Sequence, residues 1–380
     1  MSQTQVQALL QQVQLDAALD LLNEWLQREP QSTLALQYQG LTRLWLGDAV
    51  AAEASFRAAL ALDPTLPRNQ ANLGISLLAQ QRYAEGLPLY EARDQVDGPR
   101  FPGLTAQRRW QGEALAGRRL LLVREQGFGD QIQFIRFAAE LKALSAGAVI
   151  ASVSPGLGSL LASAPGVDAL SEGDIPSEAY DLWCPLMSLP CLLGIAAPPA
   201  PARLPYLHAP AAQHQHWQQR IDAWAGDKPR IGVVWAGSAQ SAIDTRRTLP
   251  AALMLEILHA RGQAVAFSLQ LGDAALTLID QQIAAGLIPL FDLLQDFADT
   301  AAVIEQLDLV ISVDTAVAHL AAALGKPVWL LLPVGADWRW GQSGEQTPWY
   351  PSMRIFRQTQ YGNWRDVALS VAGELQRGLA

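Results

Sequence analysis

The spacing of hydrophobic residues changes near residue 118, and this change divides the chain into two parts. In residues 1–98 apolar positions recur with the spacing of amphipathic helices, whereas later residues form short apolar runs separated by amphipathic segments. Short apolar runs predict buried strands, and the segments between them predict helices that pack on a sheet. The pattern therefore predicts an α + α/β chain, with helices first and parallel sheets after them.

The helical part repeats with a period of 34 residues, and its clearest copy runs from Gly47 to Pro64. A small residue where helices cross, an aromatic residue four positions later and a closing proline at this period resemble tetratricopeptide repeats. The resemblance implies a short solenoid that binds extended peptide, although so few repeats could also only cap or pack on the next domain. The matching positions are Ala18, Ala52 and Gly86; Leu22, Phe56 and Tyr90; Gly40 and Gly74; and Pro30, Pro64 and Gly98.

Strands are expected in two groups, on either side of a proline-rich linker at residues 195–210. Strands that alternate with helices predict parallel, doubly wound sheets, which bind ligands at their carboxyl ends. The expected strands are 119–124, 148–153 and 180–184 before the linker, and 230–235, 264–269, 288–291, 307–313 and 328–332 after it. We therefore divide the chain into helical repeats (1–98), a connector (99–117), a first α/β domain (118–208), a second α/β domain (209–362) and a C-terminal helix (363–380).

Composition narrows the possible partners. The formal net charge of −9 and the pI near 5.1 argue against a nucleic-acid partner, because binding phosphates requires clustered Lys and Arg. Residues 1–30 lack the pattern of a signal peptide, and no apolar run reaches the roughly 18–20 residues that span a bilayer. Cys184 and Cys191 lack a common zinc-binding spacing and are expected to be free thiols. We expect a cytoplasmic protein with no membrane span.

The segment Leu307–Leu332 carries the clearest candidate for a phosphate site. Its first strand delivers Asp314 and Thr315 to the start of an Ala/Leu-rich helix, with His319 one turn inside. A helix N-terminus presents unpaired backbone N–H groups and partial positive charge, which suit a phosphate. The alternative is an ordinary β-α-β crossover in which Asp314 or Thr315 is only the N-cap.

A glycine-containing loop between the first strand and helix of the first α/β domain carries a second candidate. Gln126, Gly127 and Gly129 precede Asp130, and the glycines allow another molecule to approach the backbone closely. Ile132 stands where a dinucleotide fingerprint requires its third glycine, so an NAD site is not expected. Asp130 is either a cap of the helix or a general base that faces the cleft.

Other polar residues follow strands of the second α/β domain. Arg246 and Arg247 lie in a loop that could be solvated, or could supply positive charge to a leaving diphosphate. Ser238, Gln270, Asp299 and Thr300 also follow strands, and Asp299 or Thr300 could be plain N-caps. Trp338 and Arg339 lie in an aromatic loop that suits either sugar stacking or buried packing.

Three motifs together resemble the heptosyltransferase-like group of GT-B glycosyltransferases: REQGFGDQIQF, GVVWAGS and SVDTAVAHLAAALGKPVWLLLP. The resemblance covers roughly residues 118–380 and implies two Rossmann-like domains, with the acceptor on the first and a nucleotide-sugar donor on the second. It implies that Asp130 is the acceptor base and that Arg247 faces the donor diphosphate. It further implies that Asp314, Thr315 and Ala316 hold the donor phosphates, with His319 nearby. Ala316 departs from the glycine common in the family, and Arg247 from the common lysine.

These observations predict a metal-independent glycosyltransferase that uses a nucleotide-diphosphate sugar as its donor substrate and needs no cofactor. The repeats would recruit a protein or peptide acceptor. One alternative is a tetratricopeptide scaffold or binding protein with an inactive GT-B body; another is a different GT-B activity, such as a nucleotide-sugar epimerase. The expected donor contacts include Ser238, Gln270, Asp299 and Thr300, and the expected acceptor or sugar contacts are Gln126, Gly127, Gly129, Trp338 and Arg339.

Overall fold

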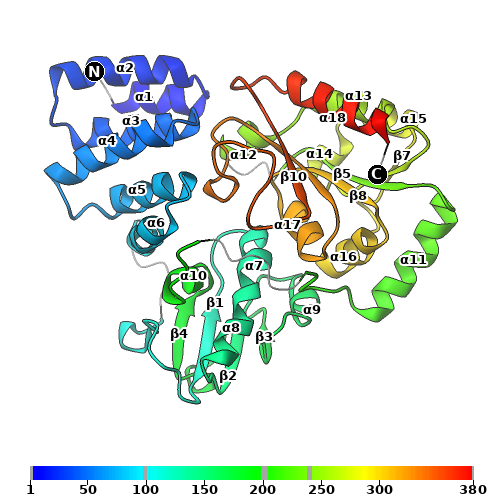
Figure 1. Ribbon diagram of the computed structural model, residues 1–380, viewed down its shortest axis with the longest axis horizontal. Helices are drawn as coiled ribbons and strands as arrows, with labels where there is room; N and C mark the ends of the chain where they lie inside the picture. The colour runs from blue at the N-terminus through cyan, green and yellow to red at the C-terminus, as the bar shows by residue number, and fades with distance from the viewer. Residues whose placement is uncertain (1–2, 97–100, 102, 198–203, 238–241, 379–380) are drawn as a thin grey trace.

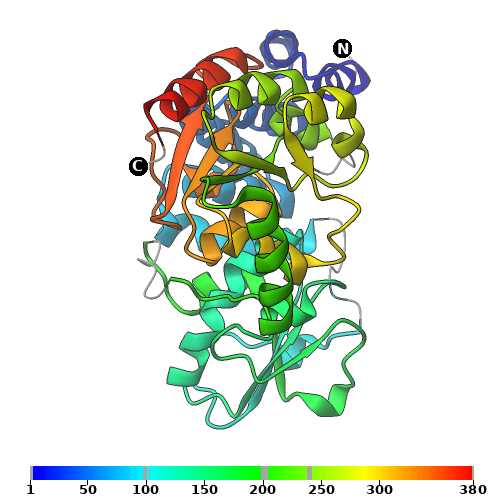
Figure 2. The same ribbon diagram turned by 90° about the vertical axis from the view of Figure 1, so that its right-hand side faces the viewer.

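The computed structural model describes residues 3–96, 101, 103–197, 204–237 and 242–378. Figure 1 shows helical hairpins at the N-terminus, a smaller sheet and a larger sheet, in that order along the chain. Figure 2 shows the smaller sheet at the opposite end of the molecule from the C-terminal helix. Within the described residues, no helix combines the length and the hydrophobicity that crossing a bilayer requires.

The N-terminal helices have the period that the sequence predicted. The second helix of each pair begins at Leu15, Ala49 and Tyr83, one period of 34 residues apart. The region is therefore consistent with repeats. Gly40 explains the need for a small residue, because a Cβ there would lie 2.6 Å from the Phe56 ring of the partner helix. The helices are α1 (Gln3–Gln11), α2 (Leu15–Arg28), α3 (Thr33–Trp45), α4 (Ala49–Leu62), α5 (Pro67–Ala79) and α6 (Tyr83–Tyr90).

The smaller sheet contains four parallel strands in the order β3-β2-β1-β4. Leu120 and Leu122 of its central strand are fully buried, as the apolar run predicted. The three-residue strand β3 was not predicted, because it is short and none of its residues is buried. The strands are β1 (Arg119–Val123), β2 (Ala148–Ser152), β3 (Ala169–Ser171) and β4 (Leu182–Pro185); the helices are α7 (Phe128–Phe134), α8 (Ala138–Ala143), α9 (Gly158–Leu161) and α10 (Leu189–Leu192).

The larger sheet contains six parallel strands in the order β10-β9-β8-β5-β6-β7. Its edge strand β10 was not predicted. The C-terminal helix was predicted correctly, with Val367, Val371 and Leu375 on its buried face. The strands are β5 (Arg230–Val234), β6 (Val265–Ser268), β7 (Leu287–Pro289), β8 (Leu309–Val313), β9 (Val328–Leu332) and β10 (Met353–Arg357); the helices are α11 (Ala211–Ala225), α12 (Ala242–Arg247), α13 (Ala251–His259), α14 (Asp273–Leu276), α15 (Ile279–Ala284), α16 (Phe297–Glu305), α17 (Ala316–Ala323) and α18 (Arg365–Arg377).

Aromatic side chains join the three regions at one junction. Trp338, in a 3-10 turn of the second α/β domain (Trp338–Trp340), packs against Tyr83 and Tyr90 of the repeats with ring centroids 6.4 and 6.1 Å apart. Trp349 packs against Phe134 of the first α/β domain at 6.0 Å. Because edge-to-face packing of this kind stabilises a fixed geometry, the junction holds the repeats beside both α/β domains.

Cys184 and Cys191 are free, as expected.

Candidate active site

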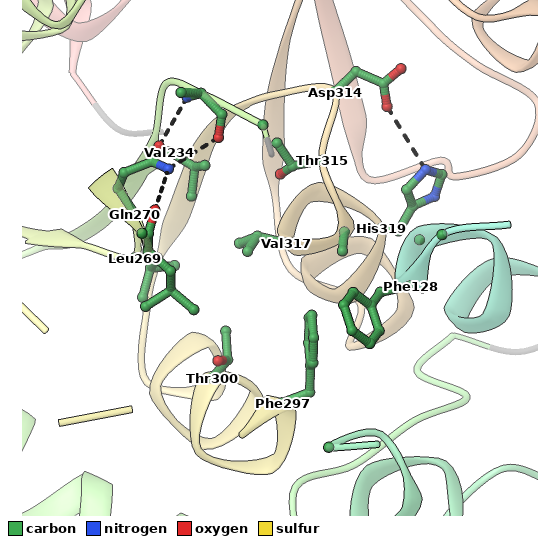
Figure 3. A pocket seen from close by; sticks show the side chains of 18 of the residues that line it. Phe128, Val234, Leu269, Gln270, Phe297, Thr300, Asp314, Thr315, Val317 and His319 are labelled. Atoms are coloured by element: carbon green, nitrogen blue, oxygen red, sulfur yellow. Dashed lines mark hydrogen bonds and ion pairs between the residues drawn. The ribbon is translucent and has the colours of Figure 1, made fainter. Parts of the chain in front are cut away.

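A cavity of about 970 Å³ opens between the carboxyl ends of the two sheets, and Figure 3 shows its centre. Loops and helix starts after β1, β5, β6 and β8 form its walls, as expected for parallel sheets. Most of the residues singled out from the sequence line it: Gln126, Gly127, Gly129, Asp130, Arg247, Gln270, Thr300, Asp314, Thr315, Ala316, His319 and Arg339. Asp299 and Trp338 do not line it, and Ser238 lies outside the described residues.

The α17 wall of the cavity offers backbone groups. Thr315 is the N-cap residue, but its side chain makes no capping hydrogen bond; its Oγ1 lies 3.1 Å from the Oγ of Ser312 instead. The first N–H groups of a helix have no acceptor within the helix, so those of Ala316 and Val317 at the cavity wall suit an anionic ligand. Figure 3 shows Thr315 and Val317 beside the cavity centre. This geometry matches the expected phosphate site, while the role stays a prediction.

Arg247 brings a fixed positive charge to the same wall. Its Nη1 donates to the backbone oxygen of Asp314 at 2.9 Å, so the guanidinium lies beside the start of α17. Gly237 makes this position possible, because a Cβ there would be 2.7 Å from Nε of Arg247. Its neighbour Arg246 is used differently: Nη2 donates to backbone oxygens between the repeats and the second α/β domain, including that of Trp45 at 2.9 Å.

Buried charge near α17 changes the ionisation of two side chains. Burial, followed by the nearby carboxylate of Asp337, raises the pKa of Asp314 to about 6. Burial lowers the pKa of His319 well below its usual value, and neighbouring arginines lower it further, so the imidazole is neutral. Its Nε2 lies 3.9 Å from Oδ1 of Asp314, and its Nδ1 lies 3.1 Å from the hydroxyl of Tyr350. A neutral His319 offers a hydrogen bond rather than a charge.

The α7 wall of the cavity presents Asp130. Its Oδ2 accepts a hydrogen bond from the backbone N–H of Gly127 at 2.8 Å, so the residue does cap its helix. Its side chain is also 17% exposed, at the cavity wall. Burial raises the pKa of Asp130, against the opposing effect of the Arg339 guanidinium. A carboxylate with a raised pKa in a cleft is suited to accept a proton. The cap and the base are therefore compatible descriptions of one residue.

Arg339 was expected to contact the acceptor or sugar, and the structure shows it holding protein groups instead. Its Nη2 donates to Oδ1 of Asp130, its Nη1 donates to Oδ1 of Asp337 at 2.8 Å, and its Nε donates to Oε1 of Gln133 at 2.6 Å. The side chain is buried, and its nitrogens are occupied by these partners. The ion pairs therefore connect the α7 wall to the second α/β domain.

Gly129 also has a different use from the one expected. A Cβ at this position would lie 2.7 Å from Cδ2 of His319, so the missing side chain lets α7 and α17 pack directly on each other. The close approach shown here is between the two α/β domains, while Gly129 also lines the cavity and its expected ligand contact stays a prediction. Gln126 lies at φ +56°, and its Nε2 donates to the hydroxyl of Tyr90 in the repeats at 2.9 Å.

The side chains of three expected donor contacts are hydrogen-bonded to protein groups, and one of them, Asp299, does not line the cavity. The side chain of Gln270 accepts from the N–H groups of Trp235 and Ala236 and donates to the oxygens of Ala236 and Leu271, so all its hydrogen-bonding capacity is used by the backbone. Asp299 does not line the cavity, and its oxygens accept from Trp217 Nε1 and Gln295 N at 3.0 Å. Thr300 lines the cavity, but its hydroxyl donates to the oxygen of Asp296, which is the true N-cap of α16.

Trp338 is likewise not a sugar platform in this cavity. It is 3% exposed and packs among Tyr83, Tyr90 and Trp349 at the junction of the three regions. The buried-packing alternative is therefore correct for Trp338. Phe128 and Phe297 are the aromatic residues that do line the cavity, with ring centroids 5.0 Å apart. Phe128 stands between the two glycines of the first loop, and the sequence pattern did not predict it as a cavity residue.

Comparison with known proteins shows what part of the chain around this site is similar to. Residues 223–367 match glycosyltransferase family 9 (heptosyltransferase). The matched segment lies in the second α/β part of the chain and is similar to that family. A glycosyltransferase of family 9 from Veillonella parvula is 13% identical and superposes with a TM-score of 0.51 over 70% of this chain and 99% of that chain, which shows the same fold. This likeness supports a GT-B-like arrangement.

Among curated proteins, the chain is similar to Protein FlbA of Caulobacter vibrioides, at 30% identity over 389 residues. The match covers 93% of this chain and 63% of the relative, so the chain spans less than two thirds of that protein's length. The ADP-heptose lps heptosyltransferase II of E. coli is 14% identical, with a TM-score of 0.46 over 68% of this chain and 98% of that chain. The tetratricopeptide assignment of the N-terminal helices stays a prediction.

Proposed function

We propose that the chain transfers a sugar from a nucleotide-diphosphate sugar to a hydroxyl acceptor, without a metal ion. One observation carries the proposal: the cavity joins a partly exposed carboxylate, Asp130, to a helix N-terminus beside a fixed arginine, Arg247. A general base and an anion site on opposite walls are the two parts that glycosyl transfer to a hydroxyl requires. The match of residues 223–367 to glycosyltransferase family 9 supports the same reaction class.

The donor would bind on the second α/β domain. Its diphosphate would accept hydrogen bonds from the first N–H groups of α17 and face the guanidinium of Arg247. Its base would lie in the apolar part of the cavity, which is lined by Val234, Leu269 and Phe297. Gln270 would support this site indirectly, by holding the chain after β5 in place.

In the reaction, Asp130 would take the proton of the acceptor hydroxyl as its oxygen attacks the anomeric carbon. The bond between that carbon and the diphosphate oxygen breaks, and its electron pair leaves with the diphosphate. Arg247 and the α17 N-terminus would stabilise the added negative charge. A positioned base typically contributes a factor of about 10²–10⁴ to the rate.

The acceptor would be a protein that the helical repeats recruit. The repeats lie against the second α/β domain, with Arg246 donating to the backbone oxygen of Trp45 across the contact. A protein bound there would be held close to the cavity, which raises its effective concentration. The cytoplasm is the expected compartment.

Calorimetry and thermal-shift measurements with a panel of nucleoside diphosphates and nucleotide-diphosphate sugars test the proposal. We expect at least one of them to bind and stabilise the protein. Arg247→Gln should weaken that binding about tenfold, since a charge-assisted contact is lost. Arg365→Gln, an exposed arginine on α18, is the matched control and should bind as the unchanged protein does. If no nucleotide binds at millimolar concentration, the proposal is wrong.

A further inference from the structure

A second cavity of about 710 Å³ lies between the repeats and the second α/β domain. Helices α3 and α5 form one side, and the segments 333–338, 341–342 and 357–359 contribute to the other. Four residues belong to the walls of both cavities: Gln126, Arg247, Asp314 and Asp337. The second cavity therefore ends beside the groups to which we assign the base and the phosphate site.

The repeats present equivalent positions to this second cavity. Leu41 and Ile75 are one repeat period of 34 residues apart, and so are Trp45 and Ala79; all four line the cavity. Within each helix these residues follow the spacing of one face, so successive repeats turn the same apolar surface toward the second α/β domain. A ligand that extends along the array meets the same kind of surface at each repeat.

Most polar side chains of the wall are already occupied by protein groups. Arg246 donates to three backbone oxygens, and Arg357 donates to the backbone oxygens of Trp340 and Gly341. Oε1 of Gln358 accepts from the N–H groups of Val334 and Gly362, whereas its Nε2 is buried and has no hydrogen-bond partner among the described residues. An oligosaccharide carries many hydroxyl groups, and each one buried without a partner is costly, so this wall disfavours a sugar polymer.

The wall suits an extended polypeptide better. Its apolar residues can bury apolar side chains, and the half-buried amide of Asn72 has no hydrogen-bond partner among the described residues. A side-chain amide has both donor and acceptor groups and can pair with one peptide group of an extended chain. Asn72 lies on the same face of α5 as Ile75 and Ala79, which places this amide within the apolar surface.

We infer that the second cavity receives a segment of the acceptor polypeptide, in which apolar residues flank the hydroxyl that is modified. This inference rests on the proposed function and specifies its acceptor. The hydroxyl would reach Asp130 past Gln126 and Asp337, the residues shared by both cavities on that side. Entry from the repeats leaves the other end of the main cavity to the donor, so both substrates can be bound at once.

Binding of synthetic peptides to the full chain tests the inference. The probes are fluorescent peptides with one central Ser or Thr, flanked either by Leu, Val and Ala or, in the comparison set, by Asp and Lys. We expect the apolar set to bind more tightly, and Ile75→Glu to weaken that binding at least tenfold. Leu62→Glu, which places the same charge on an exposed position of α4 outside both cavities, should leave it unchanged. Asn72→Ala serves as a milder variant, with an expected loss of about threefold.

Nucleotide binding, measured by calorimetry on the same samples, separates this inference from the proposed function and shows that each variant is folded. Nucleotide binding with no peptide binding overturns the inference and leaves the proposed function intact. Peptide binding that neither Ile75→Glu nor Asn72→Ala weakens places the acceptor elsewhere and also overturns it. Displacement of bound peptide by a neutral oligosaccharide would assign the cavity to a sugar polymer instead. Absence of nucleotide binding counts against the proposed function itself.

Discussion

The two walls of the main cavity hold their chemistry in different ways. On the α7 wall one side chain, Asp130, is the proposed base, and Gly127 and Arg339 fix its position. On the α17 wall the useful groups belong to the backbone, while the side chain of Thr315 turns to Ser312. Transfer should therefore depend on the identity of one residue of the α7 wall. Donor binding should instead depend on the charge and shape of the side chain at the start of α17.

The strongest test of this contrast is Asp130→Asn. The amide keeps the size of the carboxyl group but cannot take a proton, so we expect transfer to fall by about 10³-fold. Donor affinity, measured by calorimetry, should change less than twofold, because the donor is bound by the opposite wall. The readout for transfer is the release of nucleoside diphosphate in the presence of acceptor.

Asp337→Asn is the matched control for Asp130→Asn. It removes a carboxylate from the same ion-paired group, bound to the other end of Arg339, but not the proposed base. We expect it to retain transfer within about tenfold of the unchanged chain. If the two variants lose activity equally, Asp130 has a structural role and the α7 wall does not supply the base.

A smaller effect is expected from Thr315→Glu on the opposite wall. The added carboxylate stands at the helix start and repels the donor diphosphate, so the donor Kd should rise by about 30-fold. Thr315→Val removes the hydroxyl but adds no charge and keeps the backbone N–H groups, so its Kd should rise less than threefold. Calorimetric titration with the donor distinguishes the two, and equal affinities would show that the diphosphate does not bind at α17.

The same contrast explains what could be predicted from the sequence. The phosphate-site candidate depends on a strand, a turn and a helix that are continuous in the chain, so local pattern located Asp314 and Thr315. The partners of Asp130 were not predictable, because Arg339 is 209 residues away. The need for Gly129 likewise depends on His319 in another domain. Local pattern predicted the elements, whereas contacts between domains decided what their side chains do.

Trp338 and Gln270 show the same limit. Both lie close to predicted features, yet Trp338 does not line the main cavity, and the amide of Gln270, which does line it, is fully hydrogen-bonded to the backbone. The aromatic rings of the repeats surround Trp338, and backbone groups after β5 use the whole amide of Gln270. The spacing of residues along the sequence does not show which residues a polar or aromatic side chain contacts in the folded protein.

Arg339→Gln tests the connection between the walls and should have a moderate effect. The guanidinium lowers the pKa of Asp130, so its loss should raise that pKa further. Because the base works when deprotonated, transfer declines as pH falls through this pKa, and the acidic limb of the pH–rate profile should move to higher pH. Arg339→Lys retains the positive charge and should keep the limb close to its original position. A loss of rate with an unmoved limb in both variants would indicate a structural role only.

The smallest expected effect concerns Asp314 and the pH dependence of donor binding. Its pKa of about 6 means that the carboxyl group is largely ionised above neutral pH and becomes protonated as pH falls. Ionised Asp314 repels the diphosphate, so the donor should bind more tightly at acidic pH, by about fivefold, and binding should take up a proton. Asp314→Asn should bind equally well across this range. Calorimetry in two buffers of different ionisation enthalpy measures the proton uptake. If donor binding by Asp314→Asn still depends on pH, another group causes that dependence, and the carboxyl group of Asp314 does not lie beside the bound diphosphate.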